Sequence, residues 1–344
     1  MKSNPKMVFF GAGVIGGSVG GWISPRYDNI WFLDQGETAK ALREKGITTY
    51  LQDHKDQAEK TNVKVINDLA EVPDVDVVVL GVKNYSLEPV AKLIKDKIGD
   101  RAVIVSMANG MENQRVLPKY FSRVIYCVVS FNAWMDEPGV IGYQKKGPLV
   151  LGTPDNGLRA EMAEVSRVFN LGVETVVTPH LSDAVHCKIV INLTNSLTTL
   201  VGYRFRTISD PVLFQKLLTG LTSEGVGIIK ANGIRECKLG GMPSWTLLTV
   251  VAKLPTFITK PIFDKNVKKM VISSMAQDVL QRKGQSNELD SINGYIVELA
   301  DKAKLAAPFN RTIFEMSKRE FARPDFQPLD VKVVWDEVRK RMRG

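Results

Sequence analysis

The glycine-rich stretch near the start of the chain constrains the fold most. The apolar run Met7–Phe10 predicts a short buried strand, and the next residues are Gly11, Ala12, Gly13, Val14, Ile15 and Gly16, the pattern G-x-G-x-x-G. In this pattern Gly11 permits a tight turn, Gly13 lets the backbone approach a pyrophosphate, and Gly16 lets the following helix pack closely on its strand. The helix N-terminus offers free N–H groups to the anion. We expect residues 11–16 to bind a dinucleotide.

Two other interpretations of this stretch are open. A glycine-rich loop without a ligand is one, and a secretory signal is the other, because Lys2 and Lys6 precede an apolar run. The dense glycines and the absence of an A-x-A-like cleavage site argue against a signal. A second strand, 29–33, follows the helix and ends in Asp34, which favours the dinucleotide interpretation.

Length and composition predict a two-domain globular protein. The chain has 344 residues, of which 44 % are hydrophobic and 24 % charged. No apolar run reaches the roughly 18 residues that a membrane span needs, so we expect no membrane partner. The three cysteines are widely spaced and form no C-x-x-C pair, which predicts a reducing cytoplasmic location. With only three histidines as well, we expect no nitrogen–sulfur metal site.

The net charge of +9 raises the alternative of nucleic-acid binding. Basic residues cluster late in the chain, around 265–269, 318–323 and 339–343, without interleaved aromatic residues. A phosphate-bearing cofactor with a carboxylate substrate also favours a positive field. We therefore expect a small-molecule partner and no nucleic acid; the oligomeric state stays open, with a homodimer as one option.

The first half of the chain alternates between strand and helix patterns. Expected strands are 7–10, 30–33, 47–51, 63–66, 76–82 and 102–106, and expected helices are the one after Gly11, 38–44 and 87–98. This alternation predicts a doubly wound parallel sheet of the Rossmann type. After Arg123 the pattern predicts antiparallel strands at 124–131, 139–143 and 148–151, then a helix, 158–169, and a strand, 173–177. The first domain would span 1–179.

The second half predicts almost only helices. Helical periodicity covers 183–201, 210–232, 245–253, 263–283, 287–304 and 310–321. The predicted joints are Gly233, Gly240, Gly241, Pro255, Pro261 and Pro308. We expect a helical domain at 180–323 and a C-terminal tail at 324–344 with an amphipathic helix near 331–342.

Three candidate ligand-binding residues follow predicted parallel strands of the first domain. Asp34 could accept hydrogen bonds from the adenosine ribose and would repel a 2′-phosphate, which favours NAD over NADP. Lys83 and Asn109 stand where the carboxyl ends of strands face a ligand. The alternatives are a capping or turn residue for Asp34, a surface lysine for Lys83 and a turn former before Gly110 for Asn109.

The most informative segment of the second half is 188–195. Lys188, Asn192 and Asn195 stand at positions i, i+4 and i+7, so they share one helix face, and apolar residues cover the rest. A solvent face is the alternative, but asparagine is a poor helix former and solvent faces usually carry Glu, Lys and Gln. The pattern favours a buried hydrogen-bonding site.

Polar residues also gather in 273–278 and 287–294, which read SSMAQD and NELDSING. Buried polar groups on helices need partners. Ser274 and Glu288 are the candidates here, since a glutamate at this position could anchor a lysine or bind a hydroxyl. Capping is the alternative for Ser286 and Asn287.

Taken in order, these motifs resemble ketopantoate reductase (2-dehydropantoate 2-reductase). The resemblance covers about 7–321 and rests on GAGVIG, the strand before Lys83, Asn109-Gly110, the lysine–asparagine face, and SSMAQD followed by ELDSING. It implies a Rossmann domain followed by a helical domain like the C-terminal domain of 6-phosphogluconate dehydrogenase, with the active site between them. It also implies hydride transfer from NADPH or NADH to the C2 ketone of a branched 2-oxo acid, within pantothenate and coenzyme A biosynthesis.

The resemblance further implies residue roles. Lys188 would be the general acid, which suits a lysine whose pKa an apolar site lowers, and Glu288 would orient it or bind cofactor ribose. Asn109, Asn192, Asn195 and Ser274 would hold the substrate or the nicotinamide end, and Lys83 would lie near the cofactor.

The chain departs from the family pattern in three places. Many relatives carry an arginine suited to NADPH where this chain has Asp34-Gln35, so Asp34 predicts NADH. The second asparagine often stands one residue further on than Asn195, and segment 237–264 is longer than in compact members. These departures leave open a reductase of another branched or aromatic 2-oxo acid. A non-catalytic dinucleotide-sensing regulator is a third hypothesis.

Overall fold

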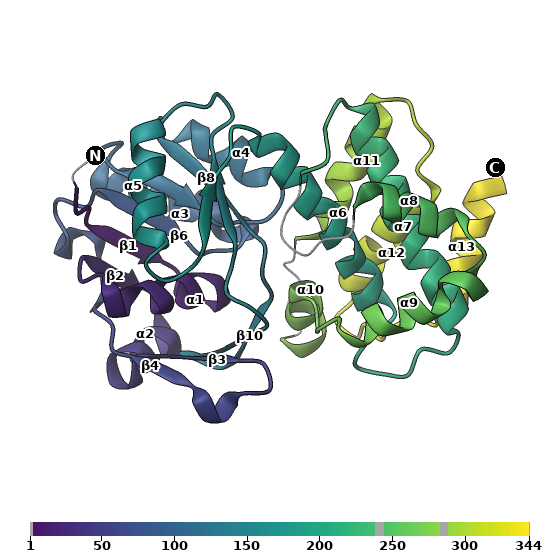
Figure 1. Ribbon diagram of the computed structural model, residues 1–344, viewed down its shortest axis with the longest axis horizontal. Coiled ribbons are helices and arrows are strands. Elements are labelled where there is room, and N and C mark those ends of the chain that lie inside the picture. Colours follow the sequence, from purple (N-terminus) through teal and green to yellow (C-terminus); the bar gives the residue numbers. More distant parts are fainter. Residues whose placement is uncertain (1–2, 238–243, 283–287, 344) are drawn as a thin grey trace. The chain divides into compact units, whose positions relative to one another are not determined.

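The computed structural model of the protein describes residues 3–237, 244–282 and 288–343 (Figure 1). The chain divides into two compact units, Met1–Ser182 and Asp183–Gly344. The first is built on a largely parallel sheet with helices, and the second, where it is described, is helical. The predicted fold class is confirmed.

The main sheet of the first unit has the strand order β12-β11-β8-β7-β6-β1-β2-β5. Its strands are β1 (Met7–Phe10), β2 (Ile30–Leu33), β5 (Val65–Ile66), β6 (Val77–Leu80), β7 (Val103–Ser106), β8 (Val124–Val129), β11 (Leu149–Gly152) and β12 (Thr175–Val177). All neighbours pair in parallel except β8 and β11. The strand order reverses between β1 and β6, which is where a doubly wound sheet opens a crevice for a ligand.

Helices cover both faces of this sheet, as expected for a parallel sheet whose strands are apolar on both sides. They are α1 (Val14–Ile23), α2 (Gly36–Lys45), α3 (Leu87–Ile98), α4 (Glu112–Val116) and α5 (Arg159–Phe169). The largest core lies on the face covered by α1 and α5. There the ring of Phe9 packs 5.6 Å from that of Phe32 and 6.2 Å from that of Phe169, measured between centroids.

A second, four-stranded sheet packs beside α1 in the order β4-β3-β10-β9. It contains β3 (Ile47–Leu51), β4 (Glu59–Thr61), β9 (Ala133–Glu137) and β10 (Val140–Tyr143). The expectation of three antiparallel strands at 124–151 is therefore only partly right. β8 and β11 do pair antiparallel, but β10 belongs to the other sheet, where it pairs antiparallel with β9 and parallel with β3.

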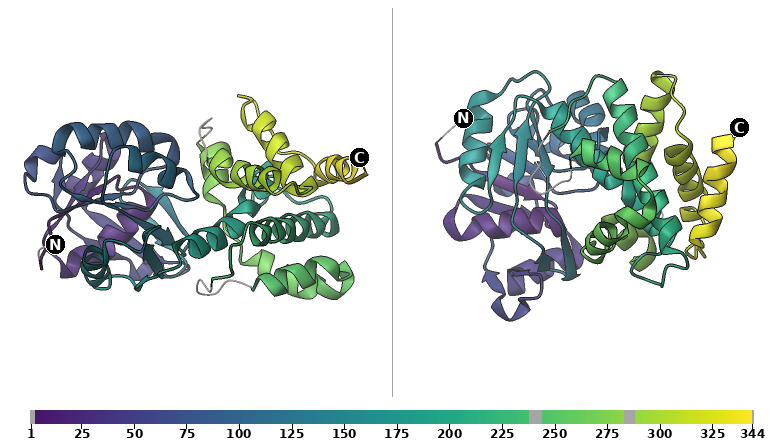
Figure 2. Two further views of the ribbon diagram at one scale, coloured as in Figure 1. Left: turned by 90° about the horizontal axis from the view of Figure 1, so that it is seen from above. Right: turned by 45° about the vertical axis from the view of Figure 1, so that its right-hand side comes forward.

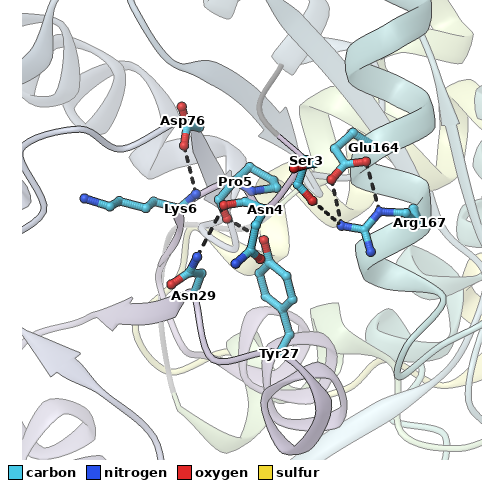
Figure 3. A network of polar contacts seen from close by, with 9 residues as sticks. All are labelled: Ser3, Asn4, Pro5, Lys6, Tyr27, Asn29, Asp76, Glu164 and Arg167. Carbon is cyan, nitrogen blue, oxygen red and sulfur yellow. Dashed lines mark hydrogen bonds and ion pairs between the residues drawn. The ribbon is translucent and has the colours of Figure 1, made fainter.

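The residues before β1 are held by a polar network within the first unit (Figure 3). The Tyr27 hydroxyl donates to the carbonyl of Pro5 at 2.6 Å, and the Arg167 guanidinium donates to the carbonyl of Ser3 at 2.9 Å. The Lys6 N–H donates to the Asp76 carboxylate, also at 2.9 Å. These contacts tie the entry of β1 to α5 and β6, and so fix the strand that leads into the glycine turn.

The second unit is described as a set of helices (Figure 2). They are α6 (Leu181–Leu200), which begins at the end of the first unit, α7 (Pro211–Ala231), α8 (Trp245–Lys253), α9 (Thr256–Lys268), α10 (Ser274–Ala276), α11 (Tyr295–Lys302), α12 (Pro308–Phe321) and α13 (Val331–Arg343). The Asp210 carboxylate caps α7 by accepting hydrogen bonds from the N–H groups of Val212 and Leu213. No helix in the described ranges is long and apolar enough to cross a membrane.

The structure differs from the expected helices in three respects. Helix 263–283 is wrong as one element: α9 ends at Lys268, and a new helix begins after Ser273, whose hydroxyl caps it by accepting from the Ala276 N–H at 3.1 Å. Pro261 lies inside α9 instead of at a joint. Gln277–Gln281 and Asp290–Gly294 are π-helical. The predicted joints Gly240 and Gly241 and the caps Ser286 and Asn287 lie outside the described residues.

The residues 324–343, which belong to the expected tail, pack within the second unit. The Leu329 N–H donates to the Leu200 carbonyl at the end of α6, at 2.8 Å. The Trp335 ring on α13 lies 6.4 Å from the Phe309 ring on α12. The apolar face of α13 is therefore covered by α12 and α7.

Candidate active site

Three glycines make the turn after β1 possible. Gly11 adopts a φ of +91°, a conformation that L side chains rarely adopt. A Cβ added at Gly16 would lie 2.1 Å from the Gly11 carbonyl oxygen, and one added at Gly81 would lie 2.3 Å from the same oxygen. The turn, the start of α1 and the end of β6 therefore meet at a distance that only glycine permits.

Gly13 differs from these three because a Cβ added there would meet nothing within 4 Å. It is the N-cap of α1, and the first turn of that helix carries no acidic residue. Free N–H groups at a helix N-terminus, an open space beside Gly13 and the absence of a repelling carboxylate on that turn suit an anion. The residues present thus fit the pyrophosphate of a dinucleotide.

Asp34 lies directly after β2, and its carboxylate is oriented by the backbone. One oxygen accepts from the Ala12 N–H at 2.6 Å, and the other accepts from the Gln35 N–H at 2.8 Å. A carboxylate oxygen can accept more than one hydrogen bond, so the same group retains capacity for ribose hydroxyls. Asp34 is not the N-cap of α2, a position that Gln35 occupies without a side-chain bond.

The loops after β6 and β7 are joined by an asparagine. The Asn84 side-chain amide donates to the Asn109 carbonyl at 2.6 Å. The buried Asn113 amide donates to the Ala108 carbonyl at 3.0 Å and to the Ser106 hydroxyl at 3.2 Å. The half-buried Lys83 and Asn109 therefore stand on adjacent loops at the carboxyl edge of the sheet, the edge that carries the glycine turn.

In the second unit, α6 carries the predicted lysine–asparagine face. Asn192 is buried, and Lys188 and Asn195 are half-buried. Their neighbours Ile189, Val190, Leu193 and Leu197 are fully buried in the core. The face is thus a partly buried polar strip beside apolar core residues, and not a fully exposed surface.

Two further segments contact α6. The Ser273 hydroxyl lies 3.4 Å from that of Thr199, which places Ser274 next to the C-terminal half of the helix. The Asn293 amide donates to the Leu193 carbonyl at 3.3 Å, so the π-helical turn that follows Glu288 packs against the middle of α6. Glu288 is buried, and its carbonyl accepts from the Ser291 hydroxyl at 3.0 Å. The second unit therefore gathers Lys188, Asn192, Asn195, Ser274 and Glu288 around one helix.

Residues on the remaining faces of α6 support this arrangement. His186 Nε2 lies 2.8 Å from the Tyr295 hydroxyl on α11, which fixes α6 relative to that helix. Burial raises the pKa of the Cys187 thiol to about 12, so the residue next to Lys188 is a neutral thiol at pH 7.

Sequence reasoning missed Asn113, Asn293 and the His186–Tyr295 pair. Asn113 and Asn293 are at most 3 % exposed and bind backbone carbonyls, a role that leaves no spacing pattern in a sequence. The one available signal was polar residues standing among apolar ones next to the motifs already identified.

Comparison with known proteins places this geometry in a family context. A 2-dehydropantoate 2-reductase of Pyrococcus horikoshii is 26 % identical over 318 residues, which are 91 % of this chain and 96 % of that protein. The crystal structure of a PanE/ApbA family ketopantoate reductase from Ralstonia eutropha superposes with a TM-score of 0.68 at 21 % identity, covering 97 % of this chain and 99 % of that one.

A second solved structure shares the fold. D-mandelate dehydrogenase in a ternary complex with NADH and anilino(oxo)acetate gives a TM-score of 0.72 at 16 % identity, covering 97 % of this chain and 99 % of that chain. Residues 7–156 match the family described as ketopantoate reductase PanE/ApbA, and residues 180–320 match its C-terminal counterpart. The chain therefore belongs to the ketopantoate reductase family.

Proposed function

We propose that this protein is an NAD(P)H-dependent oxidoreductase that reduces 2-dehydropantoate to pantoate. The observation that carries the proposal is the polar strip of α6, where Lys188, Asn192 and Asn195 share one partly buried face beside apolar core residues. Relatives named 2-dehydropantoate 2-reductase, alignable over nine-tenths of the chain, support the substrate.

The first unit carries the residues that would bind the cofactor. The backbone around Gly13 and the start of α1 would bind the pyrophosphate, Asp34 the adenosine ribose, and Lys83 and Asn109 the part of the dinucleotide nearer the nicotinamide. When bound, a reduced nicotinamide supplies a hydride to the C2 carbonyl carbon. The support lies in the open space at Gly13 and in the position of these residues at the carboxyl edge of the sheet.

The second unit supplies the proton. As the C2–O bond gains negative charge, the Lys188 ammonium stabilises it and transfers a proton to the oxygen, which completes the hydroxyl group. Lysine then regains its proton from solvent. Asn192, Asn195 and Ser274 would hold the carboxylate and hydroxyl groups of the substrate, and Glu288 would orient Lys188 or bind the cofactor ribose.

For the cofactor we propose NADH. A carboxylate at position 34 can accept hydrogen bonds from ribose hydroxyls but repels a 2′-phosphate, and Asp34 is held at the glycine turn by Ala12. That D-mandelate dehydrogenase, a protein of the same fold, was solved with NADH is consistent with this preference.

A second candidate is the reduction of another branched or aromatic 2-oxo acid. Asp34 and the length of segment 237–264, longer than expected for compact members of the family, favour it, as does the likeness to a D-mandelate dehydrogenase bound to anilino(oxo)acetate. In this case the polar strip of α6 and the dinucleotide site keep their roles, and only the substrate differs.

The test is a panel of 2-oxo acids assayed at 340 nm, the absorbance of reduced nicotinamide. Ketopantoate, benzoylformate and 2-oxoisovalerate are compared by kcat/KM with NADH. We expect ketopantoate to rank first by at least about ten-fold, the preference that about 1.4 kcal/mol of differential transition-state binding gives. Benzoylformate in first place would favour the second candidate. No oxidation with any 2-oxo acid would leave a dinucleotide-binding regulator as the remaining hypothesis.

A further inference from the structure

Helices α8 and α9 form a corner on the surface of the second unit, and their inner faces pack on α7. Trp245 of α8 is buried, and the Thr259 hydroxyl of α9 accepts from the Gln215 amide at 2.6 Å. The Phe263 ring lies 6.3 Å from that of Phe214, also on α7. These contacts fix which sides of the two helices face the protein.

Both helices also expose apolar side chains. Leu247, Val250 and Leu254 follow one another at helical spacing to the end of α8, and Ile258 and Ile262 do the same on α9. The two rows meet where Leu254-Pro255 joins the helices. Phe257, at this junction, is 78 % exposed, and Ile262 is 63 % exposed. Single exposed apolar residues are ordinary, but six of them within two consecutive helices indicate an interaction surface.

Basic residues flank this apolar corner. From Ser244 to Met270 the sequence has five lysines and one acidic residue, Asp264. Lys253 and Lys265 are exposed, and Lys260 pairs with Asp264 at 2.5 Å. The corner thus presents apolar side chains surrounded by positive charge, on a chain whose net charge is already +9.

The charge decides which occupant fits this surface. A second copy of the chain would bring the same lysines against one another, and like charges at an interface oppose association. An anionic bilayer complements both components, because lysine ammonium groups reach the headgroups while their methylene stems and the neighbouring apolar side chains enter the interfacial layer. Such docking needs no membrane-spanning helix.

We propose that the α8–α9 corner docks this enzyme reversibly on anionic lipid surfaces. Phe257, Ile258 and Ile262 enter the interfacial layer, and Lys253 and Lys265 bind the acidic headgroups. This differs from the expectation of no membrane partner, which the sequence analysis based on the absence of a spanning segment. The proposal is independent of the substrate and of the proposed activity.

The experiment is sedimentation of the full-length protein with vesicles of phosphatidylcholine alone or with 30 % phosphatidylserine, roughly the composition of an anionic leaflet. We expect binding to the anionic vesicles only, and weaker binding at 0.5 M salt, because salt at about this concentration screens the attraction. Phe257→Ser combined with Ile262→Ser should lower the partition coefficient at least about ten-fold. Lys253→Glu combined with Lys265→Glu should lower it by a similar factor, since each lysine contributes about five-fold.

Leu93→Ser provides a control, because Leu93 is an exposed leucine on α3 in the first unit, 46 % exposed. This variant should bind vesicles like the wild type. The melting temperature of every variant is compared with that of the wild type, since all the substituted side chains are exposed and should leave it unchanged.

Three results would overturn the proposal. They are equal binding to neutral and anionic vesicles, no binding to either, and a wild-type dimer in solution that Phe257→Ser converts to a monomer. The last result would assign the corner to contact between two copies of the chain.

Discussion

The carboxylate of Asp34 accepts a hydrogen bond from the backbone N–H of Ala12, at 2.6 Å. This bond joins the end of β2 to the middle of the glycine turn, so the acidic side chain is held beside the expected pyrophosphate site. Its negative charge is therefore part of the nucleotide site, and the choice between the two nicotinamide dinucleotides should depend on it.

Replacing Asp34 by Asn should change cofactor preference. The Asn side-chain oxygen can still accept from Ala12, which keeps the bond to the turn. The bond from the Gln35 N–H is lost, together with the charge that repels a 2′-phosphate. We expect the wild type to prefer NADH and the variant to lose at least about ten-fold of that preference. Two like unit charges 4 Å apart repel each other by about 1 kcal/mol in water, and by more near a protein surface. The measurement is kcat/KM for both cofactors with one 2-oxo acid.

Asp34→Ala serves as the comparison, because it removes the hydrogen bond as well as the charge. It should bind both dinucleotides less tightly than Asp34→Asn does. A wild-type enzyme with a strong NADPH preference would show that the charge of Asp34 does not govern selection.

Gly13 and Gly16 should respond differently to the same added methyl group. Gly13→Ala places a Cβ in open space, so the free energy of unfolding should fall by less than about 1 kcal/mol, the cost of alanine at an N-cap. The same Cβ would occupy space needed by the pyrophosphate, and the Kd for NADH should rise at least about ten-fold.

Gly16→Ala instead brings a Cβ to 2.1 Å from the Gly11 carbonyl oxygen. The backbone must shift, and unfolding free energy should fall by about 1–3 kcal/mol or more. Thermal unfolding and cofactor titration of the two variants separate the effects. Equal destabilisation by both substitutions would contradict the geometry of the turn.

The stability of the first unit should fall in alkali because of Tyr27. Burial raises the pKa of its hydroxyl from 10.0 to about 12, and that hydroxyl donates to Pro5. A tyrosine whose pKa is higher when folded favours folding below pH 10. That contribution is lost as pH rises from 10 to about 12, because the unfolded state releases the proton first.

Tyr27→Phe should therefore lower the unfolding free energy by about 1 kcal/mol at pH 8, the usual value of one hydrogen bond. The same variant should lose less stability than the wild type between pH 10 and 11. Urea unfolding at these pH values measures both effects. Parallel pH profiles for the two proteins would rule out Tyr27 as a source of the alkaline loss.

The elements with strong local patterns could be predicted from sequence. Strand β1, strand β3 and helix α3 have the predicted limits, because a continuous apolar run or a clear helical period is a property of the segment alone. The missed strands β4 and β9 are the two edges of the small sheet. The sequence of β4, Glu59–Thr61, is polar, and that of β9, Ala133–Glu137, has no period-two alternation. Their pairing with β3 and β10 defines them as strands.

The residues of the candidate site could be proposed from the sequence, but the contacts that hold the neighbouring segments against α6 could not. Lys188, Asn192 and Asn195 could be placed on one face because helical spacing is regular. The break before Ser274 could not be predicted, since it depends on a serine cap and on contact between Ser273 and Thr199 of α6. The roles of Lys188 and Glu288 in catalysis stay predictions.

Turnover by Lys188→Ala tests most directly whether Lys188 donates the proton. We expect kcat to fall by about 10²–10⁴-fold, the usual contribution of a general acid, while the Kd for NADH changes less than about three-fold. Lys302→Ala, which removes an exposed lysine from α11 in the same unit, should keep wild-type values of both. A Lys188→Ala enzyme that retains wild-type kcat would contradict the assignment of proton transfer to this residue.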